Sequence, residues 1–212
     1  MAAALDKVVA VVHGPVSAEA LPAVLPDTVE RVAVYRPHPT ETAPGTRDGV
    51  GVVHAWVADG RGIDWRALSP HPIDAWLVDE WIAPDRPGES WDVAVTVGVP
   101  SPGIVHLPTV VRRPGLTHDA MVRHWRDVHA PLVAVHNPGV ARYVQNVVRT
   151  PLTPDAPDVD GMAQLHFRSL DDFRERFHAS DESRAVVTAD VAEFLDRERG
   201  WRLLAEETWV RT

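Results

Sequence analysis

Short stretches of alternating and helically spaced apolar residues follow one another along the whole chain. The first half has strand-like patterns at residues 7–13, 29–35, 50–57 and 91–99, with helical patterns at 18–25 and within 65–82. The second half repeats this order, with strands at 104–113, 141–148, 162–167 and 202–210 and helices at 117–135, 170–178 and 183–197. Each half therefore predicts the order strand, helix, strand, strand, helix, strand.

This βαββαβ order is typical of ferredoxin-like α+β units, whose helices cover one face of a four-stranded sheet and leave the other face bare. Two such units in one chain can bury their bare faces against each other. We therefore predict two tandem ferredoxin-like halves, residues 1–102 and 103–212, that form one intrachain α/β barrel. Two long connections, at 37–49 and 151–161, are rich in Pro, Asp and Thr. Loops of this length often cover a functional site.

The composition restricts the chemistry available to the protein. The 212 residues include no cysteine and carry a formal net charge of −9. The missing thiols exclude disulfides, thiolate metal sites and a cysteine nucleophile, and they fit a cytoplasmic protein. Neither half has the basic patch that binding to a phosphate backbone requires, so we expect no nucleic-acid partner. No apolar run approaches the length of about 18 residues that a membrane span needs, so we expect no membrane partner.

Several familiar motifs are absent from the sequence. The GxG fragments at 49–51 and 60–62 lack the third glycine of a dinucleotide site, and there is no GxxxxGK[ST], GxSxG or HExxH. The sequence therefore disfavours dinucleotide binding, nucleotide hydrolysis, α/β-hydrolase chemistry and zinc proteolysis.

Spaced motifs in the second half resemble a known family. The chain reads VRRPGLT at 111–117, HWRDVHAPL at 124–132 and RYVQN at 142–146. With further matches through 189–196, this region resembles the EthD-domain family of the dimeric α/β-barrel superfamily, over about residues 105–210. The first half lacks these motifs and resembles a degenerate copy. The resemblance implies small, mostly hydrophobic substrates and either ether catabolism or cofactor-free tailoring of aromatic polyketides. Relatives often have an acidic residue where this chain has Gln164.

The helix predicted at 117–135 carries candidate site residues. Trp125 lies in an apolar stripe with Met121, Val128 and Leu132, and His129 lies on its rim. Pro131 should kink or end this helix near residue 130. His129 is then either a hydrogen-bonded structural residue at the kink or a general acid/base, since free imidazole has a pKa of about 6.5. His124, expected to face solvent, is five residues from His129 and about 140° around the helix, which argues against a metal site.

Alternation along the strands suggests a site between the two sheets. In the strand 162–167, Gln164 and His166 should face the barrel interior, while Leu165 and Phe167 lie under the helices. His54 holds the corresponding place in the first half. We therefore predict His129, His166 and His54 as catalytic residues and Gln164, Tyr143 and Trp125 as substrate-binding residues, with no metal. The alternative interpretation of each of these polar side chains is a structural residue whose hydrogen-bonding groups have partners within the protein.

Other conspicuous residues are interpreted as structural. Trp76 and Trp81 are expected to fill the core of the first half. Asp190, Glu193 and Asp196 are expected to form a solvated helix face, with Asp190 capping or pairing with an arginine.

Three functional hypotheses follow from the sequence. The first is a cofactor-independent enzyme that acts on a small hydrophobic, aromatic or polyketide-like molecule, by proton transfer as an isomerase or lyase or by oxygenation. The second is a haem-binding barrel enzyme, for which the eleven histidines offer axial ligands. The third is a non-catalytic binder of a hydrophobic metabolite. Any further association is expected to be a homodimer through surfaces outside the barrel.

Overall fold

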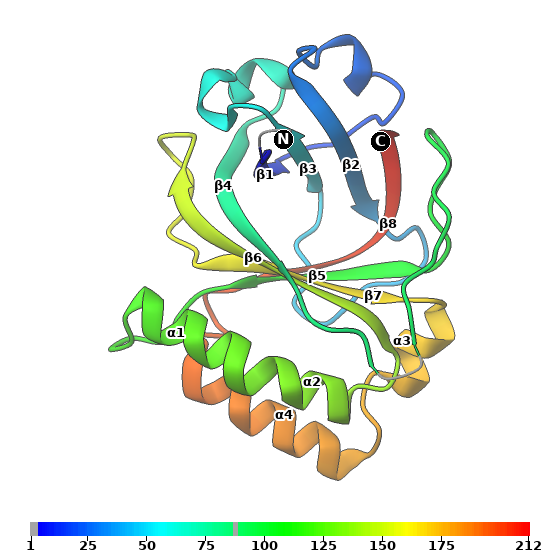
Figure 1. The fold of residues 1–212 in the computed structure, drawn as a ribbon, viewed down its shortest axis with the longest axis vertical. Coiled ribbons are helices and arrows are strands. Elements are labelled where there is room, and N and C mark those ends of the chain that lie inside the picture. The colour runs from blue at the N-terminus through cyan, green and yellow to red at the C-terminus, as the bar shows by residue number, and fades with distance from the viewer. Residues whose placement is uncertain (1–3, 87–88) are drawn as a thin grey trace.

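A computed structural model describes residues 4–86 and 89–212. Within these residues, eight antiparallel strands close into a barrel in the order β1-β3-β2-β8-β5-β7-β6-β4 (Figure 1). The strands of the first half are β1 (Asp6–Val12), β2 (Val29–Pro37), β3 (Gly51–Val57) and β4 (Ile73–Ile82). Those of the second half are β5 (Ile104–Val110), β6 (Val140–Pro151), β7 (Gly161–Phe167) and β8 (Arg202–Arg211).

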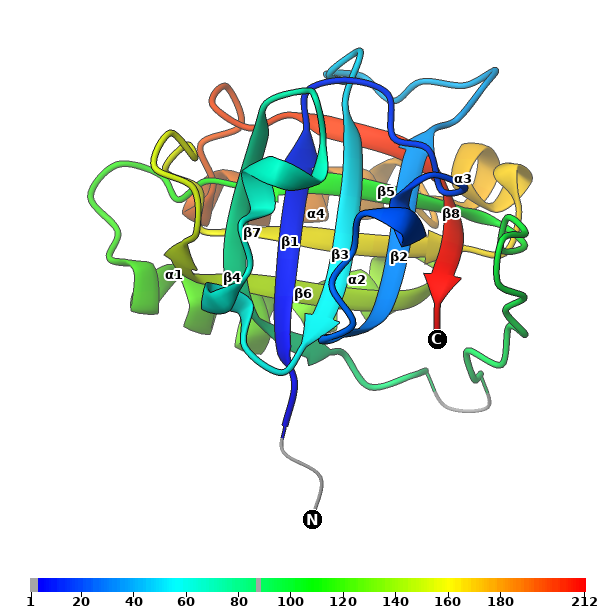
Figure 2. The same ribbon diagram turned by 90° about the horizontal axis from the view of Figure 1, so that it is seen from above.

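The two halves have the same strand order. The first half is ordered β4-β1-β3-β2 and the second β8-β5-β7-β6, and the halves join where β4 pairs with β6 and β2 pairs with β8. Figure 2 shows the strands of the first sheet crossing those of the second. This arrangement confirms the predicted pair of ferredoxin-like units in one intrachain barrel. The predicted boundary at 102–103 falls in the connection between β4 and β5.

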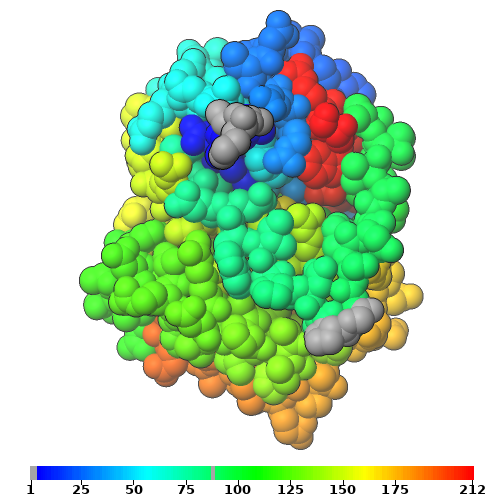
Figure 3. All heavy atoms as spheres, in the orientation of Figure 1, coloured from blue at the N-terminus to red at the C-terminus, as the bar shows by residue number. Residues whose placement is uncertain are grey.

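The predictions for two segments after β3 are wrong. The region 65–82 holds only a short 3-10 turn, η3 (Trp65–Leu68), before β4, and the segment 91–99 contains no regular strand. The side chains of Val95, Val97 and Val99 are exposed, so the alternation there marks no buried face. Instead, residues 91–99 lie on the surface (Figure 3), and Gly98 and Ser101 donate backbone hydrogen bonds to β8.

Among the described residues, helices longer than a 3-10 turn cover only the second of the two sheets. The outer face of the second sheet carries α1 (His118–His124), the π-helical turn η4 (Trp125–His129), α2 (Ala130–His136), α3 (Leu170–Arg176) and α4 (Asp181–Phe194). The outer face of the first sheet carries the 3-10 turns η1 (Leu21–Ala23), η2 (Gly60–Gly62) and η3. The helix expected at 18–25 is thus a single turn, because Pro22 and Pro26 cannot donate helical hydrogen bonds.

The apolar side chains form three cores. One lies on the outer face of the first sheet, one between the second sheet and its helices, and one inside the barrel. Trp76 belongs to the barrel interior, whereas Trp81 packs against the core of the second half, so the prediction that both fill the first half is wrong for Trp81. None of the helices in the described residues is long and apolar enough to cross a membrane. Location in the cytoplasm and association as a homodimer stay predictions.

Candidate functional site

A cavity of about 540 Å³ lies between the outer face of the second sheet and the helices that cover it. Its walls are largely apolar, with aromatic side chains from η4, β6 and α3. The apolar side chains that line the cavity include Trp125, Tyr143, Leu165, Phe173, Phe177 and Val187. Ala43 and Pro44, from the connection between β2 and β3, also line the cavity. The first half therefore helps to close a cavity in the second half, as the length of that connection predicts.

A π-helical turn shapes one side of this cavity. Pro131 has no backbone N–H and leaves the carbonyl of Asp127 without its helical donor. The N–H of Ala130 bonds to the carbonyl of Trp125, five residues back, and the helix then continues as α2 to His136. The expected break near residue 130 is therefore a π turn within a longer helical segment.

The extra residue in the π turn changes which side chains are buried. Trp125, His129 and Ala130 are buried, whereas Val128 is exposed, so the predicted stripe through Val128 is wrong. His129 moves from the rim of the stripe to the inner face. The same turn brings His124 to the side of His129, although an α-helix would place residues five apart on different faces.

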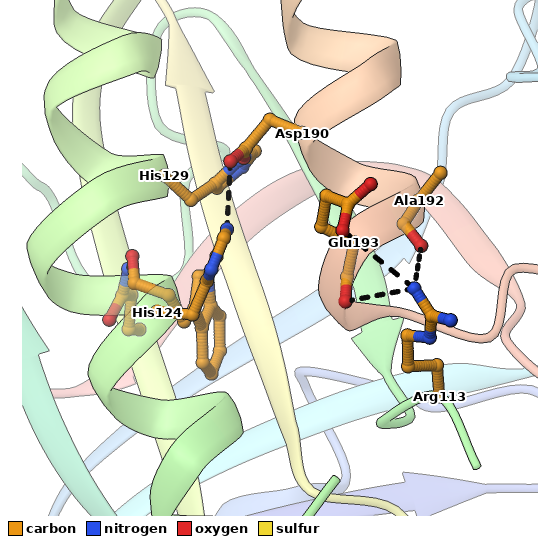
Figure 4. Close-up of polar contacts among 8 residues, drawn as sticks. Arg113, His124, His129, Asp190, Ala192 and Glu193 are labelled. Atoms are coloured by element: carbon orange, nitrogen blue, oxygen red, sulfur yellow. Dashed lines mark hydrogen bonds and ion pairs between the residues drawn. The ribbon is translucent and has the colours of Figure 1, made fainter. Parts of the chain in front are cut away.

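His124 and His129 both bind the carboxylate of Asp190 on α4 (Figure 4). Nε2 of His124 lies 2.7 Å from one carboxylate oxygen, and Nδ1 of His129 lies 2.6 Å from the other. Burial alone would raise the pKa of Asp190, but the hydrogen bonds from His129 and His124 outweigh it and lower that pKa. Asp190 therefore stays ionised and accepts the Nδ1 proton of His129, which leaves Nε2 of His129 available as a base.

The prediction that Asp190 lies on a solvated helix face is wrong. Its side chain is 9% exposed, while Glu193 is mostly exposed, as expected. Asp190 follows Val187 by three residues and precedes Phe194 by four, and both of these are buried. That spacing marks the core face of α4 and could have indicated a buried Asp190. His124 is likewise not free in solvent, because its ring stacks on Phe194.

Tyr143 and Trp125 form a hydrogen-bonded pair beside His129. Nε1 of Trp125 donates to the phenol oxygen of Tyr143 at 2.6 Å, and the Tyr143 ring lies 6.3 Å from the ring of His129. Burial raises the pKa of the Tyr143 phenol. The phenol therefore stays protonated and keeps a proton that it can donate. Three of the six predicted site residues, His129, Tyr143 and Trp125, thus line one cavity.

The other three predicted residues lie inside the barrel. Gln164 and His166 point inward, as the alternation predicts, and Leu165 and Phe167 lie under the helices. Nε2 of Gln164 donates to the phenol oxygen of Tyr35 at 2.8 Å, and the ring of His54 lies 4.7 Å from that of Tyr35.

The expectation that His129 and His166 meet at one site is wrong, because the second sheet separates them. Burial lowers the pKa of His166 to about 3, with the charges of Arg142 and Lys7 adding to the effect, and burial also lowers that of His54. Both imidazoles are therefore neutral at pH 7. A catalytic role for His54 or His166 stays a prediction.

The first half has a corresponding cavity without comparable chemistry. This cavity of about 300 Å³ lies between the first sheet and its 3-10 turns, and Leu21, Trp65 and Ile73 are among its apolar walls. His71 is its only titratable lining residue in the described part of the chain. No group of three or more His, Asp or Glu side chains among residues 4–86 and 89–212 is arranged to hold a metal ion. Of these two cavities, the one in the second half therefore holds more titratable side chains.

A family model matches the part of the chain that supplies most of the cavity lining. Residues 113–198 match the family model of the EthD domain. Residues 113–198, about two fifths of the chain, are therefore similar to an EthD domain. His124, His129, Tyr143 and Asp190 all lie within the matched EthD residues.

The barrel as a whole has a counterpart among solved structures. A structure described as "Crystal structure study of anthrone oxidase-like protein" matches with a TM-score of 0.63, over 98% of this chain and 94% of that chain, at 9% sequence identity. At that identity the likeness shows the fold alone. No curated protein matches the sequence.

Proposed function

We propose that this protein is a cofactor-independent enzyme that binds a small, largely apolar molecule in the cavity of its EthD-like second half. The observation that carries the proposal is the pair of His129 and Asp190. One nitrogen of His129 is fixed by the carboxylate at 2.6 Å, and the side chain lines an apolar cavity. A histidine oriented by a buried carboxylate is a recurrent general base.

In the proposed reaction, Nε2 of His129 removes a proton from a carbon or oxygen atom of the bound molecule. The Asp190 carboxylate stabilises the imidazolium that forms. The Tyr143 phenol donates a hydrogen bond to the enolate or phenolate oxygen on which negative charge develops. An isomerase then returns the proton to another atom of the same molecule, and a lyase expels a leaving group that takes the electron pair. In an oxygenase the anion reacts with molecular oxygen, which is the oxidant. Both reaction classes therefore share this first step.

The size and walls of the cavity suit an aromatic molecule. A volume of about 540 Å³ lies within the range of about 300–1,000 Å³ that is usual for ligand sites. Trp125, Phe173 and Phe177 offer ring faces for stacking. Anthrone, which appears in the name of the structural neighbour, is a ketone of three fused rings with an acidic methylene group, and we choose it as the probe.

The experiment measures exchange of the anthrone methylene hydrogens for deuterium, by NMR in deuterated buffer, with oxygen uptake followed separately. We expect His129→Gln to reduce the enzymatic exchange rate at least about a hundredfold. His71→Gln, in the cavity of the first half, is the matched control and should leave the rate unchanged. Binding of anthrone without enzymatic exchange would contradict the proposal and favour a non-catalytic binder.

A further inference from the structure

The cavity of the EthD-like second half has a second polar end, formed by His106 on β5. In the sheet, His106 pairs with Leu165 of β7, and Leu165 pairs with Tyr143 of β6. His106 and Tyr143 thus lie in one row, two strands apart, which corresponds to about 10 Å. Apolar Leu165 lies between them. A ligand that fills this cavity therefore meets polar groups at both ends.

His106 is buried without a polar partner. It is 5% exposed, and neither ring nitrogen has a hydrogen-bond partner among the described residues. The rings of Phe173 and Phe177 lie 5.8 Å and 5.6 Å away. Burial, with the nearby charge of Arg202, lowers the pKa of His106 to about 3. His106 is therefore neutral at pH 7, and its N–H group lacks an acceptor within the protein, which is unfavourable for a buried donor.

Arg202 supplies positive charge beside His106. Leu204 of β8 pairs with His106, and Arg202 lies two residues before Leu204. The side chains of Arg202 and Leu204 are therefore both on the cavity face of β8. One guanidinium nitrogen of Arg202 donates to the carbonyl of Pro44 at 2.9 Å. Burial, followed by the charge of Arg197, lowers the pKa of Arg202. In the described part of the chain, neither Arg197 nor Arg202 has a carboxylate within ion-pair distance.

The cavity is positively charged within an acidic protein. Its described lining contains four arginines and one carboxylate, Glu175, whereas the whole chain carries a net charge of −9. The other two arginines have partners, since Arg174 binds Glu41 and Arg184 lies 3.8 Å from Asp181. The positive charge that remains unpaired is therefore that of Arg197 and Arg202. Such a local excess attracts anionic ligands.

We propose that Arg197, Arg202 and His106 bind an acidic group of the ligand, a carboxylate or an ionised enol or phenol attached to an apolar ring system. The guanidinium groups pair with the negative charge, and the N–H of His106 donates to one of its oxygens. The spacing of about 10 Å between His106 and Tyr143 suits a ligand about two or three fused rings long. This inference rests on the proposed function for the choice of cavity, and it specifies the substrate class.

The test compares naphthoate with its uncharged methyl ester, titrated by isothermal calorimetry. We expect the protein to bind naphthoate at least about tenfold more tightly than the ester, and we expect raised salt to weaken only naphthoate binding. Arg202→Gln and Arg197→Gln should each weaken naphthoate binding severalfold or more and leave ester binding within about twofold. Arg66→Gln, which removes an exposed arginine that pairs with Asp155 outside the cavity, is the matched control.

Equal affinity for naphthoate and the ester would overturn the inference, as would loss of binding of both ligands together in a variant whose melting temperature is unchanged. No binding of either compound by the unaltered protein would also overturn it. Arg197 is exposed, so its variant keeps the test valid if Arg202→Gln disturbs folding. The anthrone experiment has a separate outcome. Loss of deuterium exchange in His129→Gln with no preference for naphthoate would leave the proposed function standing and remove only the acidic-group inference.

Discussion

His124 and His129 are five residues apart in the sequence, and both bind the carboxylate of Asp190, at 2.7 Å and 2.6 Å. The π turn from Trp125 to His129 makes this possible, because it inserts one residue into the helix before Pro131. π turns are frequent at functional sites. The carboxylate links α4 to the helix opposite and fixes the orientation of the imidazole ring that lines the cavity.

The first prediction concerns Asp190. Asp190→Asn removes the charge that orients and stabilises His129, so we expect the rate of anthrone exchange to fall about a hundredfold or more. The free energy of unfolding should decrease by about 1–3 kcal/mol, because two hydrogen bonds to a partly buried carboxylate are weakened. Rates from NMR and urea unfolding curves measure the two effects.

Glu193→Gln is the control for this variant. Glu193 lies on the same helix, is mostly exposed and is 3.8 Å from Arg113, which also contacts the backbone carbonyls at the end of α4 (Figure 4). An exposed pair of this kind contributes little, so both the exchange rate and the stability should stay close to those of the unaltered protein, within about 0.5 kcal/mol. Equal effects of the two substitutions would contradict a specific role for Asp190.

The second prediction concerns His166 and separates the two candidate locations of the site. His166→Phe fills the same space inside the barrel and should change the stability at pH 7 by less than about 2 kcal/mol. Because the second sheet separates His166 from the outer cavity, the anthrone exchange rate should not change. Loss of exchange in this variant would instead support the sequence-based prediction of a site between the sheets.

The same variant should alter acid stability. The pKa of His166 is about 3 in the folded protein and about 6.5 in the unfolded chain. As the pH falls below 6.5, the unfolded chain binds a proton that the folded protein does not, so stability decreases, by up to about 5 kcal/mol when pH 3 is reached. His166→Phe should reduce this loss, as measured by urea unfolding between pH 7 and pH 4. An identical pH dependence of the two proteins would contradict the buried, neutral state of His166.

The third prediction concerns Lys7, the only lysine in the chain. Lys7 is buried in the barrel, where it donates hydrogen bonds to Glu80 and to Gln164. Burial lowers its pKa from 10.5 to about 8, an effect that the charge of Glu80 only partly offsets. Between pH 8 and pH 10 the unfolded chain keeps a proton that the folded protein loses, so stability should rise by about 2–3 kcal/mol.

Lys7→Met should abolish this rise. The remaining Glu80 is partly exposed, so it can be hydrated after its partner is removed. Urea unfolding curves at pH 8, 9 and 10 test the prediction. A rise of the same size in Lys7→Met would show that another group is responsible.

The sequence predicts the fold well where each strand has one apolar face. The strands β5 to β8 and their helices fall close to the predicted ranges, and alternation places Gln164 and His166 inside the barrel and Leu165 beneath the helices. Apolar alternation fails to identify β4, which pairs with β1 and β6. This strand has few polar positions before Asp79, so its sequence predicts a helix in part. Apolar alternation also fails at 91–99, where alternating valines are exposed.

The candidate site is predicted only in part, for physical reasons. His129, Tyr143 and Trp125 stand out because their residue types suit a cavity. The spacing of Asp190 from Val187 and Phe194 marks it as buried, but its contact with both histidines depends on a π turn that periodicity at 100° per residue cannot describe. Nor does local pattern show that the cavity lies outside the barrel, since this depends on how far the helices stand from the sheet.

A crystal structure of the protein with bound anthraquinone, which resembles anthrone but has no methylene hydrogen to lose, tests the central claim most directly. We predict a ligand between Trp125 and Phe173, with an oxygen within about 3 Å of the Tyr143 phenol and Nε2 of His129 facing the middle ring. A ligand inside the barrel against His166, or in the first-half cavity beside Trp65, would contradict this prediction.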